Sequence, residues 1–242
     1  MLRSIKQLYG DKLGAADGGV GRVKDFYFDD EYWAVRYVVV DTGPWLAGRL
    51  VLISPHSFGS FYQNGDSLLV ELTRKQIEKS PPIDAHKPVS RQYEEDYYQY
   101  YGWPNYWDGL ELWGGAGYPV APLPFSPRRT GPGESSTDED SHLRSSKSVA
   151  GYHIQTRDGS IGRVTDFMID DKSWTIRYLV VETGHWFYGK EIVISPSDIE
   201  RISYEESMVF VTVTQAAIRD AAEYHMPRAE YQDARELRES NV

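Results

Sequence analysis

The chain contains two long segments that match each other without a gap. Residues 17–55 and residues 158–196 are identical at 21 of 39 positions, at a constant offset of 141 residues. The register extends to the start of each copy, where the triplet Leu2-Arg3-Ser4 recurs as Leu143-Arg144-Ser145. Repeats that build solenoids are about 20–50 residues long and bury a core only by stacking. A period as long as this one instead predicts two small domains related by duplication.

Each copy has the pattern of a strand-rich domain. Apolar residues rich in aromatic and β-branched types recur at alternate positions from Trp33 to Val39, and again from Trp174 to Val180. Asp-Gly pairs, Asp-Asp pairs and glycine-bounded loops separate these runs in both copies. They divide each copy into about six short strands, a spacing typical of a small barrel. A threonine suited to cap a short helix, Thr73 or Thr214, follows. We therefore predict a mainly β protein with two small barrels, each ending in a short helix.

The repeated residues also carry a family resemblance. Both copies contain the motif G-x-V-x-D-F, at Gly21 to Phe26 and at Gly162 to Phe167, followed by an Asp-Asp turn and by W-x-x-R-Y. Ile-Ser-Pro then ends a strand at residues 53–55 and 194–196. These motifs resemble the PRC-barrel family, which is named after the cytoplasmic domain of the photosynthetic reaction centre H subunit and includes a domain of a ribosome maturation factor. The resemblance implies two closed or nearly closed β-barrels that pack against partner proteins, with no shared catalytic residues.

The repeat and its flanks divide the chain into four parts. We predict a first PRC-like barrel over residues 1–82, a linker over 83–142, a second barrel over 143–225 and a charged tail over 226–242. The later part of the linker is rich in Pro, Gly and Ser and ends in Asp138-Glu139-Asp140. This composition is typical of a flexible connector, because it offers too little apolar surface to offset the entropy lost on ordering.

The earlier part of the linker is rich in aromatic residues. Tyr93, Tyr97, Tyr100 and Tyr101 have the spacing of one helical face, and a glycine and a proline follow where the helix would end. Two interpretations are open. The helix packs on a barrel with its tyrosines in the core, or it forms a docking platform for a peptide, a sugar or a quinone-like ring. In the second interpretation the contact residues are Tyr97, Tyr101, Trp103 and Trp107.

Large apolar residues also stand in a glycine-bounded loop of each copy. A turn does not require such side chains, so they either anchor a protein partner or fold over the barrel and close its core. The residues concerned are Trp45 and Leu46 in the first copy, and Trp186, Phe187 and Tyr188 in the second.

Charged residues on neighbouring predicted strands suggest structural pairs. Asp25 and Arg36 in the first copy, and Asp166 and Arg177 in the second, are expected to form cross-strand ion pairs. Such a pair contributes about 0.2–1 kcal/mol, so its expected role is stabilisation of the fold.

The sequence predicts no catalytic, cofactor-binding or metal-binding residues. The chain has no cysteine, and its six histidines lack the spacing of metal ligands. It has no motif for a nucleophilic serine or for a nucleotide phosphate. A formal net charge of −10 argues against a non-specific nucleic-acid binder. No apolar run is long enough to span a bilayer, and no signal peptide is recognisable, so we expect a cytoplasmic protein.

Together these features favour a non-enzymatic protein that docks protein partners, with the barrels as rigid supports. Homo-oligomers formed by barrel-to-barrel packing are compatible with the apolar loops. Two alternatives stay open. By analogy with the reaction-centre subunit, the chain would be a peripheral component beside a membrane photosynthetic or electron-transfer complex. In the other alternative, the aromatic linker would form the pocket of a small-ligand-binding module or of an enzyme.

Overall fold

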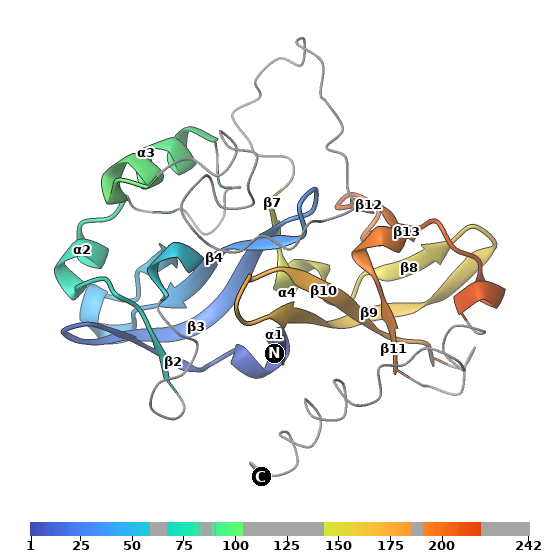
Figure 1. Cartoon of the computed structure of the whole chain (residues 1–242), viewed down its shortest axis with the longest axis horizontal. Helices are drawn as coiled ribbons and strands as arrows, with labels where there is room; N and C mark the ends of the chain where they lie inside the picture. Colours follow the sequence, from blue (N-terminus) through green and yellow to red (C-terminus); the bar gives the residue numbers. More distant parts are fainter. Residues whose placement is uncertain are drawn as a thin grey trace. The chain divides into compact units, whose positions relative to one another are not determined.

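A computed structural model describes residues 1–58, 67–81, 83, 89, 91–103, 143–184 and 191–218. The chain forms two compact units, each built on one repeat (Figure 1). The first-repeat unit comprises Gly10–Leu143. The second-repeat unit comprises Arg144–Val242 together with Met1–Tyr9. The first nine residues therefore belong to the unit of the other repeat.

The first-repeat unit contains a six-stranded sheet. Its strands follow the order β5-β4-β3-β2-β6, and β7 pairs with β3 beside that path. Neighbouring strands along the path are antiparallel, except that β2 and β6 are parallel. The elements are β2 (Lys12–Ala15), β3 (Gly18–Asp29), β4 (Ala34–Asp41), η1 (Gly43–Leu46), β5 (Leu50–Ile53), η2 (Pro55–Ser57), β6 (Ser67–Leu69), α2 (Arg74–Glu78) and α3 (Arg91–Tyr101). The strand β7 (Leu143–Ser145) begins at the last residue of this unit.

The second-repeat unit has a seven-stranded sheet of related topology. Its order is β11-β10-β9-β8-β13-β12, and β1 pairs with β9. Here β8 and β13 form the parallel pair. The elements are β1 (Leu2–Ser4), α1 (Ile5–Leu8), α4 (Ser146–Val149), β8 (His153–Thr156), β9 (Gly159–Asp170), β10 (Ile176–Glu182), β11 (Glu191–Ile194), η4 (Pro196–Asp198), β12 (Ile199–Ser203) and β13 (Met208–Val211).

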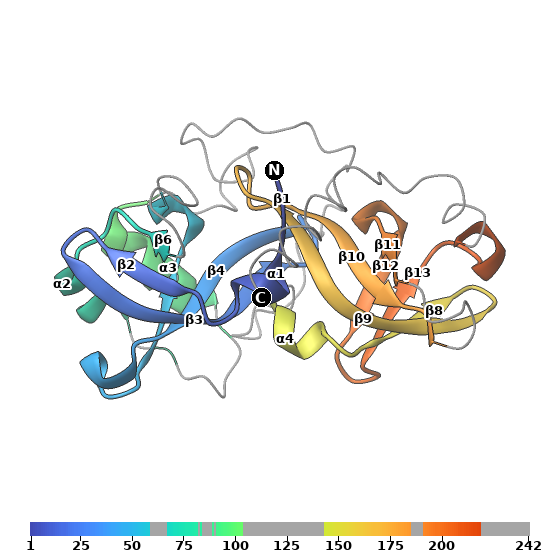
Figure 2. The same ribbon diagram turned by 90° about the horizontal axis from the view of Figure 1, so that it is seen from below.

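The longest strand of each unit is bent, as Figure 2 shows for β3 and β9. The register of β3 against β4 shifts twice, and β9 shifts twice against β10. Such bulges increase the local twist of a strand. The glycine of the G-x-V-x-D-F motif also allows close packing in this region. A Cβ atom on Gly21 would lie 2.0 Å from the carbonyl oxygen of Asp41, and one on Gly162 would lie 2.0 Å from that of Glu182.

The core of the first-repeat unit continues beyond its sheet. Every residue of β4 from Ala34 to Val40 is buried. On one side of the strand, Tyr37 packs against Tyr97 and Tyr98 of α3. Helix α3 therefore covers a face of β4 and forms part of this unit (Figure 1).

The prediction of a mainly β protein with about six strands in each copy is confirmed. A short helical segment follows the last strand of each sheet along its repeat, α2 in the first and residues 215–218 in the second. The division of the chain differs from the predicted one in two respects. Residues 1–9 were predicted to be part of the first barrel, but they belong to the second-repeat unit. Helix α3 was predicted to be part of the linker, but it packs in the core of the first-repeat unit. The Pro/Gly/Ser-rich part of the linker and the charged tail lie outside the described residues.

Candidate docking hollow

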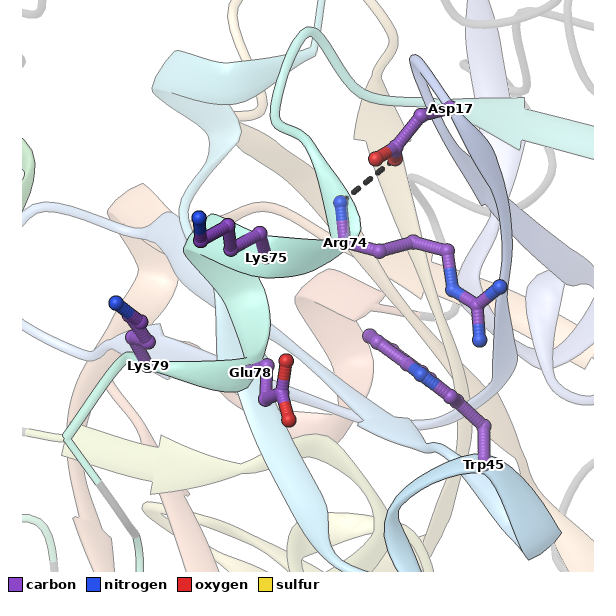
Figure 3. A pocket seen from close by; sticks show the side chains of 6 residues that line it. All are labelled: Asp17, Trp45, Arg74, Lys75, Glu78 and Lys79. Atoms are coloured by element: carbon purple, nitrogen blue, oxygen red, sulfur yellow. Dashed lines mark hydrogen bonds between the residues drawn. The ribbon is translucent and has the colours of Figure 1, made fainter.

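An open hollow of about 570 Å³ lies on the surface of the first-repeat unit (Figure 3). Three segments meet there: the turn between β2 and β3, the short helical turn η1, and α2. The lining residues are Asp17, Trp45, Arg74, Lys75, Glu78 and Lys79. Its volume lies within the usual range of ligand pockets, about 300–1,000 Å³. Its openness to solvent suits contact with a partner's surface better than enclosure of a small molecule.

Local backbone chemistry presents Trp45 to the hollow. The turn η1 includes Pro44 in its first positions, where a missing N–H costs no hydrogen bond. Gly43, at φ 54°, starts the turn and donates its N–H to the Asp41 carboxylate at 2.9 Å. Ala47 ends the turn in the left-handed conformation. The indole of Trp45 is consequently held at the surface, half-buried and not in the core.

Arg74 is fixed at both its backbone and its side chain. Its N–H donates to the Asp17 carboxylate at 2.7 Å, shown by the dashed line in Figure 3. The capping box of Thr73 and Gln76 starts the helix at this residue. The guanidinium carbon lies 4.3 Å from the centroid of the Trp45 ring. This cation–π contact, of about 0.5–2 kcal/mol, holds the cation and the indole in one surface.

The charge of the hollow is positive on balance. Arg74, Lys75 and Lys79 contribute three cations, while Asp17 and Glu78 contribute two carboxylates. Lys75, Glu78 and Lys79 are exposed. Ion pairs between exposed side chains contribute little free energy, so these residues can contact a bound protein at a small free-energy cost. In a chain whose formal net charge is −10, this is a local reversal of sign.

The second repeat keeps the backbone anchor of this site but not its cations. At the 141-residue offset, Asp158 accepts the N–H of Gln215 at 2.8 Å, as Asp17 accepts that of Arg74. This backbone hydrogen bond is the main cause that lowers the pKa of Asp158. Gln215 and Ala216 stand in place of the Arg-Lys pair. The anchor therefore belongs to the shared fold, and the positive charge is particular to the first repeat.

The predicted contact residues fall into three groups. Trp45 and Leu46 are half-buried on η1. Trp107 lies outside the described residues, as do Trp186, Phe187 and Tyr188. Tyr101 and Trp103 are half-buried and stack at a centroid distance of 4.6 Å, whereas Tyr97 is fully buried. Its burial places Tyr97 in the core and leaves it no surface for a partner.

Hydrogen bonds as well as rings hold α3 on the sheet. The Tyr97 hydroxyl donates to the Leu52 carbonyl at 3.1 Å and accepts the N–H of Ser54 at 3.0 Å. The Tyr37 hydroxyl donates to the carboxylate of Glu94, which is fully buried. Burial raises the pKa of Tyr101, at the end of α3, to about 12. These hydrogen bonds hold α3 against the sheet, so the role of the helix in this unit is structural; the helix is called the brace below.

The strand register does not set the residues of the predicted ion pairs opposite one another. Asp25 lies opposite Val39, and Asp166 lies opposite Val180. Arg36 is buried and places its guanidinium 3.4 Å from the carboxylate of Asp29 in the Asp-Asp turn. The bulges between these strands shift the register, which strict alternation in the sequence cannot reveal.

Sequence reasoning missed the role of Asp166. Its carboxylate accepts a hydrogen bond from the hydroxyl of Ser4, and another from the backbone N–H of Lys6 at 2.9 Å. The signal was present in the repeat, because Ser4 belongs to the duplicated Leu-Arg-Ser triplet. What the pattern could not show is that the triplet of one repeat packs on the other.

Among the described residues, no cluster of His, Asp and Glu side chains has the arrangement of a metal site. No helix in the same ranges is long and apolar enough to cross a membrane.

Comparison with known proteins identifies the second repeat. The family model of the PRC-barrel domain matches residues 144–218. An uncharacterized protein of Deinococcus radiodurans is 30% identical over 69 residues, which is 28% of this chain and 24% of that protein. The chain thus spans about a quarter of the length of this relative. The matched family residues cover α4 and the strands from β8 to β13. Residues 144–218 are a PRC-barrel domain.

Proposed function

We propose that the protein is a non-enzymatic interaction protein with two PRC-barrel domains, and that the hollow at Trp45 and Arg74 is its docking site. The first repeat shares 21 of 39 positions with the second over the best-matched segment, which supports a barrel of the same kind. The observation that carries the proposal is the guanidinium of Arg74 stacked on the half-buried indole of Trp45. Tryptophan and arginine are the side chains that most often dominate binding energy at protein interfaces.

The chemistry of the hollow also indicates the partner. The hollow carries three cations and two carboxylates, and one of the cations, Arg74, lies on an aromatic anchor, so an acidic segment that carries an apolar side chain complements the site in both charge and polarity. The second repeat lacks the cations at the equivalent positions, and the first repeat is therefore the one expected to make this contact.

The experiment is affinity purification of the full chain followed by mass spectrometry. Wild type is compared with Trp45→Ala and Arg74→Glu, and Lys172→Glu serves as the matched charge reversal at an exposed site outside the hollow. A protein retained by wild type and by Lys172→Glu, and lost by both hollow variants at unchanged melting temperature, supports the proposal. Its affinity for the purified hollow variants should fall by about tenfold or more.

Two results would contradict the proposal. If the hollow variants retain the same partners as wild type, the docking site is elsewhere. If Trp45→Ala lowers the melting temperature by several degrees, the indole closes the core and is not held out for a partner.

A further inference from the structure

The first nine residues, here called the N-terminal arm (residues 1–9), complete the unit of the other repeat. Its strand β1 lies antiparallel on β9, with Arg3 opposite Ile169. Its helix α1 buries Ile5 and Leu8 completely or almost so. Ser4 and Lys6 each donate a hydrogen bond to the Asp166 carboxylate, one to each oxygen. Main-chain pairing, apolar burial and a buried carboxylate thus define the site that binds the arm. This site, formed by residues 166–170 of β9, is called the receiving site below.

The end of the arm is held by side chains of the same unit. The Tyr9 hydroxyl lies 2.8 Å from the hydroxyl of Ser146, and the Lys147 ammonium lies 4.6 Å from the centroid of the Tyr9 ring. The boundary between the units follows at once, between Tyr9 and Gly10. Gly10 has φ 86°, a backbone conformation that few other residues adopt, and no heavy atom lies within 4 Å of a Cβ atom built on it.

The second repeat begins with an equivalent segment. The strand β7 carries the same Leu-Arg-Ser triplet at the 141-residue offset and pairs with β3 of the first-repeat sheet. Its serine caps the following helix as in the N-terminal arm: Ser145 accepts the N–H of Ser148, and Ser4 accepts that of Gln7. The long strand of each sheet therefore pairs with one copy of the triplet.

This arrangement has a consequence for association between chains. The contacts of the receiving site depend on the arm and on β9, not on the route of the chain that connects them. A second copy presents the same arm, with the same triplet, the same two apolar side chains and the same donors for Asp166. Exchange of identical elements between protomers is a low-cost route to dimers, because every contact it forms already exists in the monomer.

We propose that the receiving site on β9 also accepts the N-terminal arm of a second copy of this chain, so that two chains join by arm exchange. Within one chain the arm acts at an effective concentration on the order of millimolar. The internally closed monomer therefore predominates in dilute solution. Exchanged dimers form when chains fold at a comparable concentration, and the arms then remain in place on dilution.

The absence of cysteine from the sequence allows a direct test on the full chain. The variant Arg3→Cys marks the arm, and the variant Ile169→Cys marks the residue opposite it on β9. Residues directly opposite in an antiparallel pair lie within disulfide range. Equal amounts of the two single variants are unfolded, mixed at about 1 mM, refolded together, diluted and oxidised. A disulfide between the two marked positions can then form only between chains.

The expected result is a heterodimer joined through residues 3 and 169, identified by mass spectrometry of the linked peptides. Its yield should exceed, on the order of tenfold, the yield from Arg3→Cys mixed with Ser160→Cys. Ser160 is an exposed residue of β9 outside the segment that pairs with β1. A yield no higher than this control would overturn the proposal.

The double variant Arg3→Cys/Ile169→Cys, oxidised in dilute solution, provides the reference. It should form an intrachain disulfide and keep the mass of a monomer. If it forms none, the arm does not lie on β9 and the proposal fails with it. A second opposite pair, Leu2→Cys with Asp170→Cys, replaces the first if Ile169→Cys does not fold, because neither position is fully buried.

Discussion

Single residues of the repeated motif have identifiable physical roles, and Gly21 is the sharpest case. A Cβ atom there would lie 2.0 Å from the carbonyl oxygen of Asp41 and 2.9 Å from the Cα atom of Thr42. Both are backbone atoms, so relief requires the strands to separate. We predict that Gly21→Ala lowers the free energy of unfolding by about 3 kcal/mol, measured by urea denaturation.

The control for this prediction is Gly19→Ala in the same strand. No heavy atom lies within 4 Å of a Cβ atom built on Gly19, and its φ is not positive. Its free energy of unfolding should change by less than about 0.5 kcal/mol. Equal losses in the two variants would show that the general cost of replacing glycine, and not the contact with Asp41, is responsible.

His56 is expected to make stability depend on pH. Burial, and secondarily the charge of Arg36, lower its pKa below the ordinary value of 6.5. The folded state therefore binds a proton less readily than the unfolded state does. The resulting stability is fully present above pH 6.5 and is lost as the pH falls toward the folded pKa, at up to about 1.4 kcal/mol per pH unit.

The measurement is the free energy of unfolding between pH 7 and pH 5. His56→Gln should reduce the loss over this interval. A wild-type stability that rises on acidification, or an identical pH dependence in His56→Gln, would contradict the assignment.

At the scale of elements, α3 shows how far sequence reasoning reaches. The helix ends where the sequence predicts, since Gly102 adopts φ 71° and the N–H of Trp103 bonds the carbonyl of Tyr98. The buried face differs from the predicted one: Tyr98 is fully buried and Tyr100 is 40% exposed. Residue spacing shows which side chains share one face of a helix. The surface against which the helix packs decides which of these faces is buried. Here α3 also forms hydrogen bonds to the sheet through Glu94 and Tyr97, and no hydrophobic pattern encodes these contacts.

Removing one hydroxyl tests this brace. In Tyr97→Phe, the Ser54 N–H loses its acceptor and the Leu52 carbonyl loses a donor, both in buried surroundings. A buried group left unsatisfied costs about 1–3 kcal/mol, so the free energy of unfolding should fall by that amount in thermal or chemical denaturation. Tyr100→Phe makes the same change on the exposed side of α3, where the hydroxyl bonds the Gln76 carbonyl, and should have little effect. Similar losses in both variants would mean that the hydroxyl bonds of Tyr97 do not hold the helix.

At the scale of the whole molecule, the duplication and the strand content followed from sequence, while the exchange of segments did not. The Leu-Arg-Ser triplet is identical in the two copies, and β3 and β9 share the motif beside which the triplets pack. A local pattern that fits two receiving strands equally well cannot say which one it occupies. Strand order and the unit boundary at Tyr9 are properties of the whole chain, so they required the structure.

Because residues 1–9 pack in the second-repeat unit, a mutation there should destabilise that unit and not the first-repeat unit that follows it in the sequence. Ile5 is fully buried in the second-repeat unit, and Ile77 of α2 is fully buried in the first-repeat unit. Each substitution by alanine should cost about 2–5 kcal/mol through lost burial and a residual cavity. In hydrogen exchange, Ile5→Ala should therefore reduce protection in β9 and β10 while β3 and β4 keep theirs, and Ile77→Ala should do the reverse. If Ile5→Ala instead exposes β3 and β4, the first residues fold with their own repeat, and the exchanged topology is wrong.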